Sequence, residues 1–78
     1  MMTTTQLQFL LSERIPGSTV QVRDLTGTSD HFYVEVVSEV FEGKSLIEQH
    51  KIVHAACEDH MQQQGGAIHA LQIKTRTE

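Results

Sequence analysis

The chain has 78 residues, and its ten acidic and six basic side chains give a formal net charge of −4 at pH 7. A domain of this size buries only about 60% of the surface that its unfolded chain exposes. We therefore expect residues 1–78 to form one domain with a thin core, in which helices cover one face of a sheet. The acidic balance argues against nonspecific phosphate binding as the main task, because such binding depends on clustered lysine and arginine.

The sequence also bears on the compartment. No apolar run approaches the length that spans a membrane, and the first five residues lack the basic and apolar segments of a secretion signal. Cys57 is the only cysteine, which excludes an internal disulfide and fits a reducing compartment. We therefore expect a cytoplasmic protein.

The first predicted element is a short helix. Thr5 and Gln8 have the spacing of a capping box, and leucines follow at helical spacing. The helix should end at the Ile15-Pro16-Gly17 segment, since proline disfavours helix in the residue before it and glycine favours a turn.

Two strands should come next. Residues 20–23 alternate between apolar and polar side chains, and residues 31–38 form a second, β-branched strand pattern whose alternation reaches Val40. The small polar residues 26–30 lie between them as a turn. Because this connection is short, the two strands are predicted to form an antiparallel hairpin.

A turn and a longer helix should follow. Gly43 permits a backbone conformation that a β-carbon would resist. Ser45 and Glu48 have the spacing of a second capping box at the start of a helix. This helix is predicted to span residues 46–63 and to stop at the glycine pair of residues 65–66.

The last predicted element is a strand over residues 68–75, with His69, Leu71 and Ile73 on one face. The element order is therefore α-β-β-α-β, and the fold class is α+β: a three-stranded mixed sheet with two helices on one face. The predicted core consists of apolar side chains from all these elements: Leu7, Leu10, Leu11, Val20, Val22, Phe32, Val34, Val36, Phe41, Leu46, Val53, Ala56, Leu71 and Ile73.

Three segments of this chain resemble the BolA family. They are residues 36–45, which contain Phe41-Glu42-Gly43-Lys44-Ser45, residues 49–56 around His50, and the Ile68-His69-Ala70-Leu71 motif. The similarity extends from the first helix to Thr77. It implies a fold related to the class II KH domain, partnership with a monothiol glutaredoxin, and a [2Fe–2S] cluster that the two proteins hold together.

The resemblance also implies which residues bind iron. A [2Fe–2S] cluster takes four ligands, and histidine can replace cysteine on one iron. His69 matches the ligand that family members share. Relatives carry a second cysteine or histidine in the loop between the first two strands, where this chain has Thr28 or Ser29, which are poor soft ligands. His31 is the nearest candidate, and its alternative is an exposed polar residue at the start of a strand.

The isolated chain should bind no cluster, because two histidines cannot complete one. The resemblance implies that the glutaredoxin active-site thiolate and the thiol of its bound glutathione supply the missing ligands. We expect His31, the turn of Gly43, Lys44 and Ser45, His50 and His69 to converge on one partner surface. Lys44 and Lys51 would then lie at its edge.

The predicted long helix carries a second set of metal-ligand side chains. His50, His54 and Cys57 are spaced i, i+4, i+7 and share one helical stripe, and such ligands suit Zn²⁺. The alternative is that the stripe packs against the sheet, with Cys57 acting as a small hydrophobe. In that case His50 supports the turn or the partner surface, while His54 and His60 are surface residues.

Nucleic-acid binding is the alternative function, because KH-like domains bind single strands and some relatives are transcriptional regulators. Lys44, Lys51, Lys74 and Arg76 could form a basic patch near the histidines, which the neutral Gln49 would weaken. The predicted turn before the long helix has one glycine, however, whereas a KH domain uses a Gly-x-x-Gly loop. No nucleophile motif or phosphate-binding glycine loop occurs, so we expect no enzyme activity.

Overall fold

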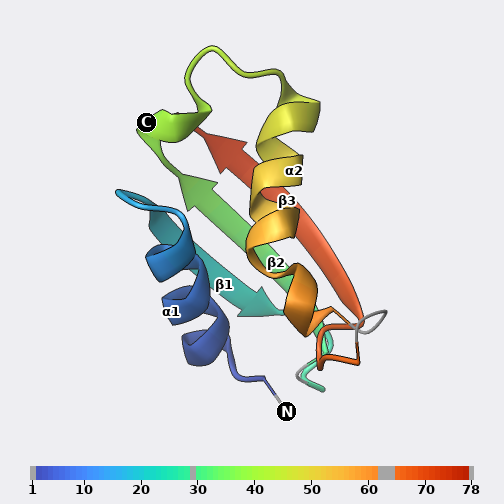
Figure 1. Ribbon diagram of the computed structural model, residues 1–78. Helices are drawn as coiled ribbons and strands as arrows, with labels where there is room; N and C mark the ends of the chain where they lie inside the picture. The colour runs from blue at the N-terminus through green and yellow to red at the C-terminus, as the bar shows by residue number, and fades with distance from the viewer. Residues whose placement is uncertain (1, 29, 62–64, 78) are drawn as a thin grey trace.

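The computed structural model describes residues 2–28, 30–61 and 65–77, and it confirms the α-β-β-α-β order (Figure 1). Two short 3-10 segments accompany the main elements. The elements are α1 (Thr4–Arg14), β1 (Thr19–Asp24), β2 (His31–Val37), η1 (Glu39–Phe41), α2 (Leu46–Ala56), η2 (Glu58–His60) and β3 (Ala70–Arg76). Among the described residues, no helix has the length and apolar character to cross a membrane.

The three strands form one mixed sheet in the order β1-β2-β3. Strand β1 pairs antiparallel with β2, as the hairpin prediction requires, and Val22 lies opposite Val34. Strand β3 pairs parallel with β2, with His31 opposite Ala70. Because β2 and β3 run in the same direction, both begin at one end of the sheet and finish at the other (Figure 1).

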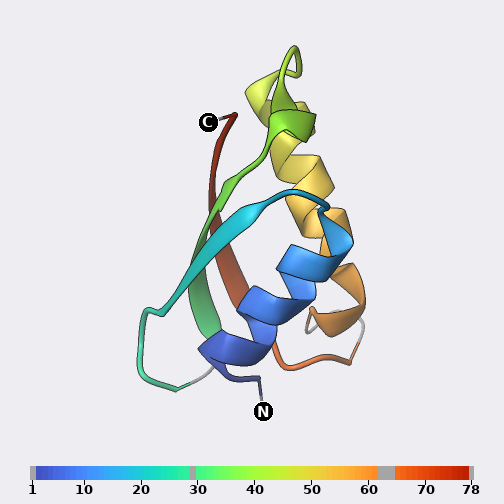
Figure 2. The same cartoon turned by 90° about the vertical axis from the view of Figure 1, so that its left-hand side faces the viewer.

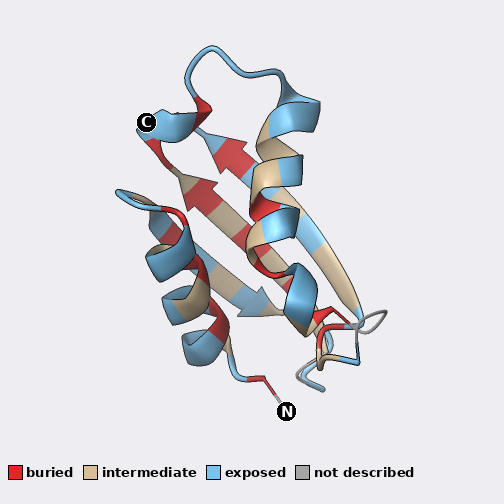
Figure 3. Cartoon of the chain, in the orientation of Figure 1, coloured by how far each residue is buried: buried red, intermediate tan, exposed pale blue. Residues whose placement is uncertain are grey.

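Both helices cover the same face of the sheet and leave the other face open (Figure 2). Alternation along β2 turns Phe32, Val34 and Val36 towards the helices, and all three are fully buried. Their neighbours on β3 are Leu71, Ile73 and Thr75. The buried residues therefore form a layer between the helices and the sheet (Figure 3).

Helix α1 begins earlier than the sequence indicated. Its capping box is formed by Thr3 and Gln6, so the prediction of Thr5 and Gln8 is wrong. The Thr3 hydroxyl accepts from the Gln6 amide at 3.0 Å, and the Gln6 side chain accepts from the Thr3 amide at 2.9 Å. Met2 and Leu7, which flank this box, both belong to the core, as in a hydrophobic staple. Burial of Met2 thus favours the earlier start, and the predicted end at Ile15 is confirmed.

Helix α2 is shorter than predicted. It starts at the expected capping box of Ser45 and Glu48, but it ends at Ala56 and continues only as the 3-10 segment η2. Gln63, the last residue of the predicted helix, lies outside the described residues. Arg14 of α1 donates to the Ala56 carbonyl at 2.8 Å and to the Asp59 carboxylate at 2.7 Å. This contact between distant segments satisfies a terminal carbonyl of α2, and a local sequence pattern does not show it.

The predicted core is confirmed except at Leu46, which is 63% exposed, but five of its members are only partly buried: Leu10, Val22, Ala56, Leu71 and Ile73. Leu46 is the first residue of α2, and Val53 is the residue of this helix that is fully buried. The strand pattern also extended too far, because β2 ends at Val37 and Val40 lies exposed in η1. Ile68 forms only an isolated bridge with Met61, so β3 begins at Ala70. The core also contains residues that the sequence prediction omitted: Met2, Ile15, Cys57, Met61 and Ile68.

Candidate functional site

His31 and His69 lie together at the end of the sheet where β2 and β3 begin. Their ring centroids are 4.8 Å apart, with the ring planes inclined at 52°. His31 is the first residue of β2 and His69 directly precedes β3, so the parallel pairing of these strands brings the two side chains together. The His31 side chain is 34% exposed, and His69 is also exposed. Both predicted ligands therefore belong to one accessible site.

Asp30 connects the two histidines, and sequence reasoning missed it. Its carboxylate lies 2.8 Å from His31 Nδ1, and its backbone carbonyl accepts from the amides of His69 at 2.7 Å and Ala70 at 3.1 Å. A hydrogen bond from the Thr28 hydroxyl, together with that from His31, holds the pKa of Asp30 below its ordinary value. In the sequence, the only indication of this contact is that an aspartate directly precedes His31.

Thr28 and Ser29 are the loop positions at which the resemblance implied a second ligand. The Thr28 hydroxyl donates to Asp30 and lies 2.5 Å from the Thr26 hydroxyl, so it is engaged within the loop. Ser29 lies outside the described residues. His31 is thus the side chain beside this loop that approaches His69.

The expected convergence of the histidine pair with the turn at Gly43, Lys44 and Ser45 is wrong. This turn follows the far end of β2, at the top of Figure 1, whereas His31 starts β2 at the bottom. Seven residues of strand separate the two ends, which corresponds to about 20 Å. Gly43 does have the positive φ that the sequence suggested, at 77°.

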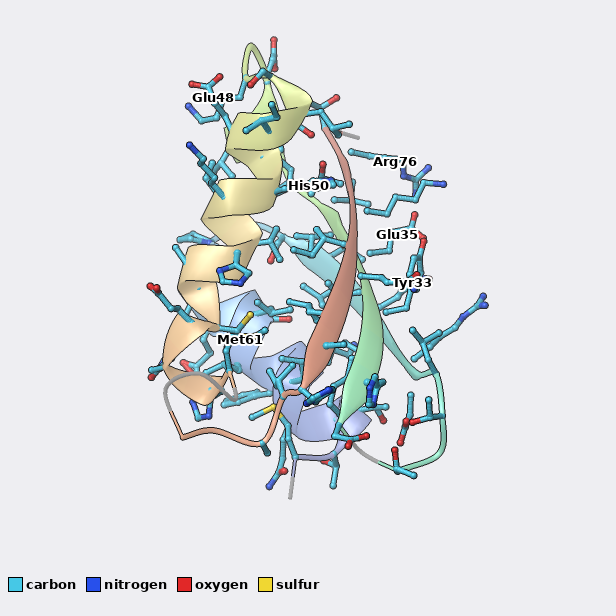
Figure 4. The ribbon with its side chains drawn as sticks, turned by 90° about the vertical axis from the view of Figure 1, so that its right-hand side faces the viewer. Tyr33, Glu35, Glu48, His50, Met61 and Arg76 are labelled. Atoms are coloured by element: carbon cyan, nitrogen blue, oxygen red, sulfur yellow. The ribbon has the colours of Figure 1, made fainter. Side chains whose placement is uncertain are left out.

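The four cations of the predicted basic patch lie in two places. Two are on the open face of the sheet, and two are in α2 or just before it. Thr75 is buried beneath α2, so Lys74 and Arg76 on either side of it point to the open face. Arg76 pairs there with Glu35 at 2.9 Å, and Figure 4 shows both on the far side of β3 from α2. Lys44 is instead exposed just before α2, and Lys51 is exposed within α2. The four cations therefore do not form one patch near the histidines.

The histidine stripe of α2 does not form a metal site. Cys57 is fully buried, and burial raises the pKa of its thiol to about 11. His54 is exposed, while His50 is partly buried and lines a surface pocket with Lys51 and Ile73. Within the described ranges, no group of three or more His, Cys, Asp or Glu side chains could hold a metal ion. The interpretation of Cys57 as a small core hydrophobe is confirmed.

The family model described as BolA-like protein matches residues 12–78 of this chain. The chain belongs to the BolA family. A BolA protein homologue from Coxiella burnetii superposes with a TM-score of 0.81 at 32% sequence identity, covering 99% of this chain and 92% of that one. The predicted fold class and the resemblance to BolA proteins are both confirmed.

Two curated relatives of this BolA-like chain carry the same family name. Protein BOLA2 of Arabidopsis thaliana is 43% identical over 75 residues, which is 95% of this chain and 76% of that protein. BolA-like protein 1 of Homo sapiens is 47% identical over 51 residues, which is 65% of this chain but only 35% of that protein. The matched part of the human protein is therefore a BolA-like segment within a longer chain.

Proposed function

We propose that this BolA-like protein is an adaptor that pairs with a monothiol glutaredoxin and shares a [2Fe–2S] cluster with it. The pair would act in handling iron–sulfur clusters or in sensing iron, in a reducing compartment such as the cytoplasm. His69 and His31 are the proposed ligands from this chain. The glutaredoxin thiolate and its bound glutathione complete the set, so the cluster exists only in the complex.

The single observation that carries the proposal is the histidine pair, whose ring centroids are 4.8 Å apart. Imidazole nitrogen is a suitable ligand for iron, and two histidines replace two cysteines on one iron in Rieske centres. The exposed position of the pair leaves room for ligands from a second protein. When bound, the cluster would supply electron transfer or an iron-dependent signal, while this chain supplies nitrogen ligands and a docking surface.

The turn of Gly43, Lys44 and Ser45, with His50 and Lys51 behind it, lies too far from the histidine pair to share one small interface. These residues stay in the proposal as a second contact with the partner. Such a contact would follow α2 along the molecule, where Ile47 is 70% exposed beside Lys51. Chemical-shift mapping with a glutaredoxin would show whether one end or both ends respond.

The experiment that tests the function mixes this chain with a cluster-loaded monothiol glutaredoxin and records absorption and circular-dichroism spectra. We expect new bands from nitrogen ligation in the wild-type complex. His69→Ala should abolish these bands and His31→Ala should weaken them. His54→Ala, which removes an exposed histidine of α2, is the matched control and should leave them unchanged.

Two outcomes would contradict the ligand assignment. One is a His69→Ala complex that forms normally and keeps the wild-type spectrum, because the chain would then dock without touching iron. The other is an equal loss in His54→Ala, since that variant alters no proposed ligand. Far-UV circular dichroism of each free variant should match the wild type, since His69 is exposed and contributes little packing.

Binding of single-stranded nucleic acid, with a role in transcriptional regulation, is the second candidate function. It ranks second because Lys74 and Arg76 lie on the opposite face from Lys44 and Lys51, and Arg76 is paired with Glu35. Titration of a labelled oligonucleotide at two salt concentrations separates the candidates. Phosphate binding must weaken steeply as the salt concentration rises.

A further inference from the structure

We propose that Asp30 is the positioning residue of the histidine site: it directs Nε2 of His31 towards the metal and fixes the backbone that carries His69. This inference rests on the proposed function, because it assigns a role relative to the ligands named there. Asp30 itself need not touch iron. It acts through His31 and through the chain segment before β3.

The carboxylate of Asp30 contacts the His31 ring. Asp30 Oδ1 lies 2.8 Å from His31 Nδ1, and the same oxygen accepts from the Thr28 hydroxyl. An ionised carboxylate only accepts hydrogen bonds, so Nδ1 must carry the proton. In the neutral ring this leaves Nε2 with a free lone pair. A carboxylate that orients a histidine in this way is the usual outer partner of a metal-bound imidazole.

The backbone of Asp30 contacts the backbone of His69. The backbone carbonyl of Asp30 accepts from the amides of both His69 and Ala70, at 2.7 and 3.1 Å. These bonds join the residue before β2 to His69, which precedes β3, and to Ala70, the first residue of β3, where the ladder begins. The side chain of Asp30 therefore orients one histidine while its main chain holds the other in place.

Asp30 also places a negative charge beside His31. The carboxylate of Asp30 is 41% exposed and is hydrogen-bonded to Thr28 as well as to His31, so its position is fixed by two partners. A fixed negative charge bonded to a ligand increases the basicity of that ligand and stabilises the oxidised form of the metal centre. Removal of the charge should therefore move the reduction potential to a more positive value.

The first test uses the free chain, so it does not depend on a cluster. Long-range proton–nitrogen NMR of the neutral ring identifies which ring nitrogen of His31 carries the proton. We expect the proton of His31 on Nδ1 in the wild type and on Nε2 in Asp30→Ala. The amide shifts of His69 and Ala70 should stay near their wild-type values, because the substitution keeps the backbone carbonyl.

The second test uses the cluster-loaded complex. Asp30→Asn preserves the side-chain volume and removes the charge, and we expect its cluster to show a more positive reduction potential than the wild type. Glu42→Gln is the matched control, since it removes one negative charge from an exposed residue at the opposite end of β2. The control should leave the potential unchanged.

The results separate this inference from the proposed function. A wild-type His31 without a proton on Nδ1, or an Asp30→Ala variant that keeps it, overturns the role of Asp30 even if the complex has its expected spectrum. An equal shift of potential in Asp30→Asn and Glu42→Gln also overturns it. If the free chain behaves as expected but the complex lacks the histidine bands, the ligand assignment is wrong and Asp30 orients a ring that binds no iron.

Discussion

Gln49 and Thr75 are joined by a hydrogen bond of 2.5 Å between the side-chain amide oxygen and the hydroxyl, which ties α2 to the last strand. The amide nitrogen of Gln49 also donates to the Lys44 carbonyl at 2.9 Å and the Phe41 carbonyl at 3.4 Å. One side chain therefore holds the turn before α2, the helix and β3 together. Gln49 therefore has a structural role and is not part of the basic patch that the sequence suggested.

Substitution of Gln49 by alanine should lower the free energy of unfolding by about 1–3 kcal/mol, because the buried Thr75 hydroxyl loses its acceptor. Urea titration followed by circular dichroism measures the change. Gln8→Ala, an exposed substitution in α1, should cost less than about 0.5 kcal/mol. Equal stabilities of the two variants would show that Gln49 does not hold the turn.

Phe41 should be a large contributor to stability. It is fully buried although it follows the end of β2, and its replacement by alanine should cost about 3–5 kcal/mol. Phe9 is 65% exposed on α1 and is the matched control, with an expected loss under about 1 kcal/mol. The same urea titration applies, and a loss below about 1 kcal/mol for Phe41→Ala would place its ring at the surface.

Substitution of Gly43 should destabilise the protein because of the backbone conformation at this position. Its φ is 77°, and a β-carbon added there would meet nothing within 4 Å, so strain and not a clash sets the cost. Gly43→Ala should lower the free energy of unfolding by about 1–2 kcal/mol. Gly43→Asn should lose less, because asparagine tolerates this region better. If the two variants have the same melting temperature, the turn relaxes to another conformation.

The Cys57 thiol should be unreactive in the folded protein. Burial raises the pKa of its thiol from 9.0 to about 11, so at about pH 8 the thiolate that reacts with disulfide reagents is scarce. Labelling should be slow in buffer and fast in denaturant. Because the folded pKa lies above the unfolded one, stability should be full below pH 9 and decline as the pH rises from 9 towards 11. Rapid labelling of the folded chain would show that the thiol is accessible.

Local patterns in the sequence determined the order and type of the elements. Alternation identified the strands, and the short polar connection identified the hairpin. The capping box of Ser45 and Glu48 placed the start of α2 correctly, because these signals act between residues close in the chain. The BolA motifs likewise lie in short segments, so the family was evident before the fold was known.

Tertiary contacts decided the rest. Helix α1 is capped by Thr3 and not by Thr5 because Met2 packs in the core, and α2 stops at Ala56, whose carbonyl accepts from Arg14 of α1. The parallel register of β2 and β3 brought His31 to His69, whereas the turn at Gly43 follows the far end of β2. Sequence spacing sets which face of a strand a side chain occupies, but only the pairing of strands decides which distant residues become neighbours.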